Sequence, residues 1–192
     1  MSESQITLPR WDMSVVYPGL ESVEFETGFQ EAIQSIDRLV ELFDQHGVGL
    51  QEAMELDDAT VQSFEVVLQE FNRLLAETRT MGAYIASFVT TDTRNDLAQA
   101  KHSEFQQHTV KLTLLSSRFK AWVGSLDIET LIERSEQAQA HAFALRRAKV
   151  EATHLMSPPE EELAAKMNLS GGSGWGKLHS DISSQLTVSV EI

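Results

Sequence analysis

Residues 157–186 read SPPEEELAAKMNLSGGSGWGKLHSDISSQL, and this stretch predicts a helix, a glycine-rich bend and a second helix. Ser157 can act as the N-cap of the first helix, and Pro158 occupies the first helical position, where no N–H is needed. Glu160 can reach back to complete a capping box. The first helix therefore has a strong start signal.

The glycines in the middle of this stretch predict how the second helix begins. Gly171 and Gly172 are expected to reverse the chain, and Ser173 is expected to cap the helix that follows. That helix carries apolar side chains at helical spacing, which are expected to pack one face of it against a neighbour: Trp175, Leu178 and Ile182.

Three longer stretches upstream also have apolar residues at steps of three and four. They predict helices over about 22–46, 58–89 and 93–123, with Gly47 ending the first. Because only a few residues join the last two, these should form a long antiparallel hairpin. Their apolar stripe is interpreted as the internal seam of that hairpin, covered by the first helix, in preference to a partner-binding coiled coil.

Smaller signals mark the remaining helices. The side chains of residues 90–93 can cap the third helix, and Gly124 is expected to end it. A short helix is expected over 127–133, followed by one over about 134–155. Small residues such as Ala148 and Ala152 on the latter predict tight packing on a neighbouring helix. Gly82 predicts close approach of a neighbour within the second long helix.

The fold class that follows is all-α: an antiparallel helical bundle with a long helical hairpin, plus a short C-terminal β-strand fragment. Residues 1–21 are expected to form an arm packed on the helices, and residues 22–185 the helical domain. In residues 186–192 apolar and polar side chains alternate, which predicts a strand. This strand is interpreted as the first of a truncated β-hairpin that leads to a missing domain.

Composition and charge exclude several kinds of site and partner. Cysteine is absent, which excludes disulfides and thiolate metal sites, and the net charge is −14. Residues 1–70 hold 15 acids and two bases, a net charge of −13, so nucleic-acid binding there is disfavoured. This acidity suits either a basic partner or a solvated helix face, and the solvated face is the preferred interpretation. No secretory signal or membrane-length apolar run is visible, so a cytoplasmic protein without membrane contact is predicted.

No site for zinc is predicted in this chain. None of the six histidines is followed by Glu, so the HExxH signature is absent. Glu104 and His108 stand four apart on a predicted helix, but two ligands without a third make a poor zinc site. No metal-binding residue is assigned.

A phosphate loop and a nucleophile are also excluded on the sequence. Gly171, Gly176 and Lys177 satisfy GxxxxGK, yet Leu178 stands where Ser or Thr would bind Mg²⁺, and no strand precedes the motif. Serines such as Ser117 lie in predicted helices without a GxSxG setting. No catalytic or cofactor-binding residue is therefore predicted.

Two runs, residues 155–162 (LMSPPEEE) and 168–178 (NLSGGSGWGKL), resemble the N-terminal helical region of the oligoendopeptidase F family of M3-type zinc metallopeptidases. The Trp11-Asp12 arm and the order of the helices fit the same resemblance. In that family the N-terminal helices form a wall of a deep substrate channel. A catalytic domain follows, in which HExxH and a downstream Glu bind zinc and the motif Glu is the general base.

The resemblance implies that the chain is the non-catalytic N-terminal domain of an oligopeptide-cleaving zinc metalloendopeptidase. Its partners would be its own C-terminal catalytic domain and an oligopeptide substrate, and zinc would be bound in the missing domain. The chain alone is expected to be inactive. The alternative is a stand-alone helical interaction module that binds a partner through the hairpin or the acidic first helix.

Overall fold

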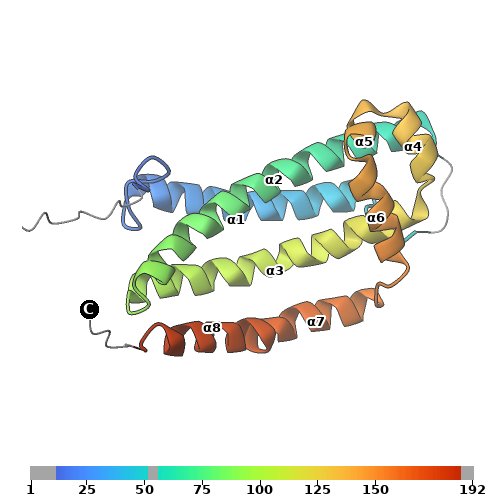
Figure 1. Cartoon of the computed structure of the whole chain (residues 1–192). Helices are drawn as coiled ribbons and strands as arrows, with labels where there is room; N and C mark the ends of the chain where they lie inside the picture. The colour runs from blue at the N-terminus through green and yellow to red at the C-terminus, as the bar shows by residue number, and fades with distance from the viewer. Residues whose placement is uncertain (1–11, 52–55, 187–192) are drawn as a thin grey trace, which may run out of the picture.

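The structure, a computed structural model, describes residues 12–51 and 56–186, and over these ranges the fold is all-helical, as predicted. Figure 1 shows the arrangement of its eight helices. They are α1 (Val23–Gln45), α2 (Asp58–Thr91), α3 (Asp96–Ser125), α4 (Ile128–Arg134), α5 (Glu136–Ala140), α6 (Ala142–Ala152), α7 (Pro158–Ser170) and α8 (Gly172–Ser183). The strand predicted over 186–192 lies outside the described residues, except for Leu186.

The three long helices α1, α2 and α3 form the body of the fold, in which α2 runs antiparallel to α1 and to α3 (Figure 1). The Ser22 side chain caps α1 by accepting a hydrogen bond from the Phe25 N–H at 3.1 Å. Gly47, with φ +60°, follows the end of α1, where a left-handed residue favours glycine. The predicted start and stop of this helix are both confirmed.

The cap predicted for α3 is wrong. It was placed in residues 90–93, but α2 extends to Thr91 and the N-cap of α3 is Asn95. The side-chain oxygen Oδ1 of Asn95 accepts a hydrogen bond from the Ala98 N–H at 3.0 Å. Asn and Asp are at least as favourable as Thr at the N-cap position. The preference of residue types for this position therefore does not decide between Asn95 and the candidates in residues 90–93.

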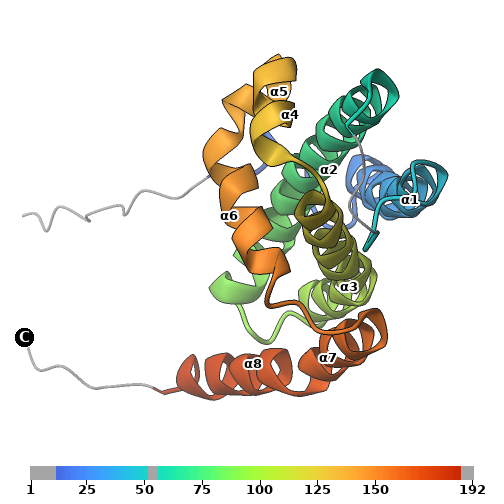
Figure 2. The same cartoon turned by 90° about the vertical axis from the view of Figure 1, so that its right-hand side faces the viewer.

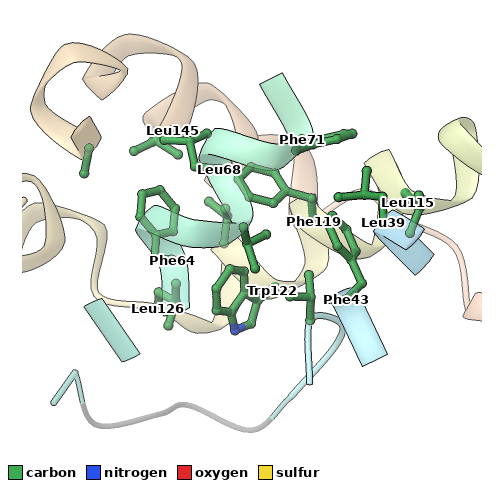
Figure 3. Close-up of a cluster of buried hydrophobic side chains, with 14 of the residues drawn as sticks. Leu39, Phe43, Phe64, Leu68, Phe71, Leu115, Phe119, Trp122, Leu126 and Leu145 are labelled. Carbon is green, nitrogen blue, oxygen red and sulfur yellow. The ribbon is translucent and has the colours of Figure 1, made fainter. Parts of the chain in front are cut away.

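The core consists of two clusters, one toward each end of the three-helix body. The larger joins the second half of α1, the first half of α2 and the second half of α3 with α4–α6, around Phe64, Phe119 and Trp122 (Figure 3). The smaller joins the other ends of α1–α3 around Phe25, Phe29 and other buried residues. The α2–α3 hairpin seam is thus buried, and its interpretation as an internal seam is confirmed.

A row of ion pairs fixes the register of α1 against α3. Lys101 Nζ lies 2.8 Å from a Glu26 carboxylate oxygen, and Arg118 Nη2 lies 2.8 Å from Asp44 Oδ1. Between these two pairs, Lys111 is bonded to Asp37. Much of the acidity of α1 is therefore balanced by cations of α3, although exposed pairs of this kind each contribute at most about 1 kcal/mol.

Helices α4, α5 and α6 pack at one end of the body (Figures 1 and 2). The prediction that Gly124 ends α3 is wrong, because α3 continues to Ser125 and Gly124 lies within it. The helix predicted over 134–155 is divided instead at His141 into α5 and α6. The short helix predicted over 127–133 is confirmed as α4, capped by Asp127.

Tight packing by small residues is confirmed where α6 crosses α3. A β-carbon built on Gly124 would stand only 2.7 Å from the Ala152 β-carbon. Gly82 of α2 is less crowded, because its built β-carbon lies 3.5 Å from a ring carbon of Phe105, an ordinary contact distance. Both glycines therefore mark close approaches of neighbours, but only Gly124 excludes a methyl group.

Helices α7 and α8 run beneath α3 (Figure 1). The predicted capping box of α7 is present, since Glu160 accepts hydrogen bonds from the N–H and hydroxyl of Ser157 at 2.9 and 2.5 Å. The predicted chain reversal is wrong: Gly171 alone separates the two helices, and α8 continues onward from α7 after a bend (Figures 1 and 2). The Ser173 cap is wrong as well, because α8 begins at Gly172 and no side chain caps it.

The segment before α1 lies against the α1–α2 end of the body. The Tyr84 hydroxyl donates a hydrogen bond to the Tyr17 backbone carbonyl at 2.9 Å, and the two rings meet edge to face at 5.1 Å. Leu20 is buried in the smaller core cluster. These contacts concern residues 17–20 of the predicted arm, whose first 11 residues lie outside the described ranges.

Candidate functional site

The six histidines are dispersed over the fold. They lie at the end of α1 (His46), in α3 (His102, His108), between α5 and α6 (His141), after α6 (His154) and in α8 (His179). Within residues 12–51 and 56–186, no three His, Cys, Asp or Glu side chains gather into a potential metal site. The described part of the chain therefore offers no assembled ligand set.

The GxxxxGK segment lies at a junction between two helices. Gly171 ends α7, and Gly176 and Lys177 lie inside α8. The Lys177 ammonium lies 3.3 Å from the Ser103 hydroxyl of α3. A phosphate loop needs a strand before the loop and a lysine directed at the phosphates. Here a helix precedes the glycines and the lysine contacts α3.

A groove of about 800 Å³ lies between α3, α6 and the start of α7. Helix α3 forms its floor, α6 and the start of α7 form its sides, and Leu50 reaches it from the segment after α1. Most of its lining is apolar: Leu50, Leu114, Ala121, Gly124, Leu126, Ala152, Leu155, Met156 and Pro158. Its size falls in the range of pockets that hold small ligands or peptide side chains.

Polar groups at the edge of this groove are engaged with the protein itself. Glu161 accepts a hydrogen bond from the Ser117 hydroxyl at 3.0 Å and another from the Met156 N–H at 3.1 Å. The Arg118 guanidinium donates to the Val48 carbonyl at 3.0 Å, and Lys149 donates to the Leu126 carbonyl. The groove therefore presents mainly hydrocarbon to whatever enters it.

A second apolar surface follows α7 and α8, and we call it the outer face. It consists of Leu163, Met167, Trp175, Leu178 and Ile182. Their exposed fractions run from 47% for Leu178 to 71% for Trp175. The prediction that Trp175, Leu178 and Ile182 pack against a neighbour is therefore wrong within the described chain.

The side of α7 and α8 that is directed at α3 combines polar groups with the partly buried Ala165 and Leu169 of α7. Three side-chain contacts connect it to α3 and its N-terminal turn: Glu161 with Ser117 at 3.0 Å, Lys177 with Ser103 at 3.3 Å, and Ser184 with Thr93 at 3.0 Å. No residue of either helix is buried. The helix pair thus rests on the body through these polar contacts and a few small or partly buried apolar groups, and five of its large apolar side chains are exposed.

His102 lies on α3 where α8 passes over it. Its Nδ1 atom is buried and has no hydrogen-bond partner. Burial lowers the pKa of His102 below its ordinary value of 6.5, and the charge of Lys177 lowers this pKa further. Both effects favour the neutral imidazole, because its protonation would place a second cation beside Lys177.

One family of known proteins matches this part of the fold. Residues 124–187 match the family model described as oligopeptidase F, which represents the N-terminal region of M3 peptidases. The resemblance to oligopeptidase F is confirmed. The match spans 64 of 192 residues, from the end of α3 through α8, and includes both runs on which the resemblance was founded. No curated protein and no solved structure matches the chain.

The oligopeptidase F match and the two apolar surfaces fall in the same part of the molecule. Helices α6, α7 and α8, which carry the outer face and two sides of the groove, all lie inside residues 124–187. The periodicity of the sequence identifies three of the five outer-face residues, Trp175, Leu178 and Ile182, but predicts that they pack internally.

No helix in the described ranges is long and apolar enough to cross a membrane.

Proposed function

We propose that this chain is the N-terminal, non-catalytic domain of a cytoplasmic, oligopeptidase F-like zinc metalloendopeptidase. It forms a wall of the channel through which oligopeptides reach a zinc site in the catalytic domain. The observation that carries the proposal is the match of residues 124–187 to oligopeptidase F. The zinc site, the channel and the substrate class rest on the family resemblance.

The groove supports a role in contacting peptides. It is concave, largely apolar and bordered by polar groups that already have partners within the protein. Such a surface accepts apolar side chains of varied sequence, because burial of hydrocarbon is non-directional.

The proposal is tested with the full-length polypeptide encoded by the parent reading frame. We expect it to hydrolyse oligopeptides, to lose this activity with a chelator and to regain it with zinc, whereas residues 1–192 alone remain inactive. A parent reading frame without HExxH contradicts the proposal, and so does chelator-sensitive hydrolysis by the highly purified 192-residue chain.

The wall role is tested by filling the groove. In the full-length enzyme, Ala121→Trp places a large ring in the groove and is expected to raise KM for oligopeptides several-fold with little change in kcat. Ala83→Trp adds the same ring at an exposed position of α2, away from the groove, and serves as the matched control. Equal KM values for the two variants contradict a contact between groove and substrate.

The alternative of a stand-alone interaction module loses support at both surfaces on which it depended. The apolar seam of the hairpin is buried, with Phe105, Leu115 and Trp122 each less than 5% exposed. Acidic residues of α1, among them Glu26 and Asp44, pair with cations of α3. The hairpin seam is therefore covered, and part of the acidity of α1 is already engaged within the chain.

A further inference from the structure

We propose that the outer face of α7 and α8 is the surface on which the catalytic domain of the same polypeptide packs. This inference rests on the proposed function, and it names the residues that make the contact: Leu163, Met167, Trp175, Leu178 and Ile182. The partner is an apolar surface of the domain that follows in the chain.

The first argument is the inverted orientation of the helix pair. A helix on the surface of a soluble domain normally directs its apolar stripe at the core and its polar side at water. In α8 Lys177 meets α3 while Trp175 is 71% exposed, and in α7 Glu161 meets α3 while Leu163 and Met167 are exposed. Large apolar side chains that face water on two successive helices mark an interaction surface.

The residue types point to a protein surface as the occupant. Trp and Met are enriched in the centres of protein interfaces, and Trp is among the residues that dominate binding energy. Met167 and Trp175 stand eight residues apart, on either side of the junction between the two helices. The middle of the outer face therefore carries the side chains best suited to anchor a partner.

The size of the outer face fits a contact between domains. Helix α7 has 13 residues and α8 has 12. At about 1.5 Å per residue and a width of about 10 Å, the two helices present on the order of 400 Å². Interfaces between domains of one chain bury roughly 300–750 Å² per side, whereas a stable complex of separate proteins needs roughly 800 Å² per side.

Connectivity favours the chain's own domain over a second copy. A domain tethered to the end of α8 has an effective concentration on the order of millimolar. A modest apolar surface is then enough to hold it.

The test compares thiol labelling of the outer face in two contexts. The 192 residues contain no cysteine, so single cysteines can be introduced at chosen positions. Met167→Cys and Ile182→Cys report on the outer face. Ser180→Cys, which is also exposed on α8 but does not belong to the outer face, is the matched control. Labelling by N-ethylmaleimide is followed by peptide mass spectrometry in residues 1–192 and in the full-length polypeptide.

We expect Met167→Cys and Ile182→Cys to be labelled at least tenfold more slowly in the full-length polypeptide than in residues 1–192. Ser180→Cys should change less than twofold. Equal rates at the outer face overturn the inference. Slow labelling in residues 1–192 that becomes fast on dilution also overturns it and identifies a second copy as the occupant.

Failure of this inference and failure of the proposed function give different results. Chelator-sensitive hydrolysis with equal labelling rates overturns only the docking surface. Protection of the outer face without hydrolysis supports the docking surface and contradicts the peptidase. A parent reading frame that encodes no further domain overturns both.

Discussion

Gly124 of α3 and Ala152 of α6 approach so closely that a methyl group on the glycine would overlap the alanine side chain. The built β-carbon of Gly124 stands 2.7 Å from the Ala152 β-carbon, well inside van der Waals contact. This approach seats α6 directly on α3, beside the groove that both helices line. The pair therefore determines the shape of the candidate site.

Gly124→Ala is expected to destabilise the protein by about 1 kcal/mol. Overpacking costs about 1–3 kcal/mol, and the better helix propensity of alanine offsets about 1 kcal/mol of it. Gly82→Ala is the matched control in α2, where the new methyl meets Phe105 at an ordinary distance, so this variant should gain up to about 1 kcal/mol. Urea unfolding measures both changes in the free energy of unfolding. An increase in both variants would contradict the close packing described at Gly124.

The two kinds of leucine in this fold should respond differently to truncation. Leu115 is 2% exposed in the larger core cluster, so Leu115→Ala is expected to cost about 2–5 kcal/mol. Leu163 is 59% exposed on the outer face, so Leu163→Ala should change the unfolding free energy of residues 1–192 by no more than about 0.5 kcal/mol. Chemical denaturation distinguishes them, and a large loss at Leu163 would show that the outer face is covered within this chain.

Tyr84→Phe removes the hydroxyl that donates to the Tyr17 carbonyl. The loss is expected to be about 1 kcal/mol, because the hydrogen bond connects the segment before α1 to α2. Amide exchange in residues 12–21 should speed up more than exchange elsewhere. Leu75→Met in the middle of α2, a volume-conserving change, is the control and should leave this exchange unchanged. Identical exchange in Tyr84→Phe and the parent chain would argue against the anchor.

The contact between α3 and α8 should weaken in mild acid. Burial and Lys177 lower the pKa of His102 below 6.5, so the unfolded chain takes up a proton at His102 before the folded chain does. The stability that the neutral imidazole provides is therefore complete above pH 6.5, and it is lost as the pH falls from 6.5 through the lowered pKa.

An NMR titration of the His102 ring measures this pKa directly. Lys177→Met should raise it toward 6.5, because the neighbouring charge is removed while burial remains. Lys166→Met, which removes a lysine paired with Glu162 on α7, should leave it unchanged. A His102 pKa at or above 6.5 in the parent chain would contradict the described surroundings of the ring.

The body of the fold could be predicted because local signals and periodicity agree there. The apolar spacing of α1–α3 identifies the buried side chains and the start of α1, and Gly47 marks the end of α1. The neighbours that cover each stripe are long helices close in sequence. The apolar periodicity of the sequence therefore identifies the same side chains that the structure buries in the hairpin seam.

Helix α8 could not be placed in the same way. Periodicity shows that Trp175, Leu178 and Ile182 share one side of a helix, but it does not show what lies opposite that side. The break at His141 was missed for a related reason, because the apolar spacing continues across it from Ala138 to Leu145. Polar contacts such as that of Lys177 with Ser103 come from residues distant in sequence, and no local pattern reports them.

The position of the last buried side chain bears on how this protein is made. Among the described residues, the fully buried core ends at Leu145, and everything from the end of α6 through α8 is added to a completed interior. Synthesis proceeds from the N-terminus, and domains generally fold as units while the chain emerges. We therefore expect α1–α6 to fold before α7 and α8 emerge from the ribosome. Helices α7 and α8 would then pack on a surface that has already formed.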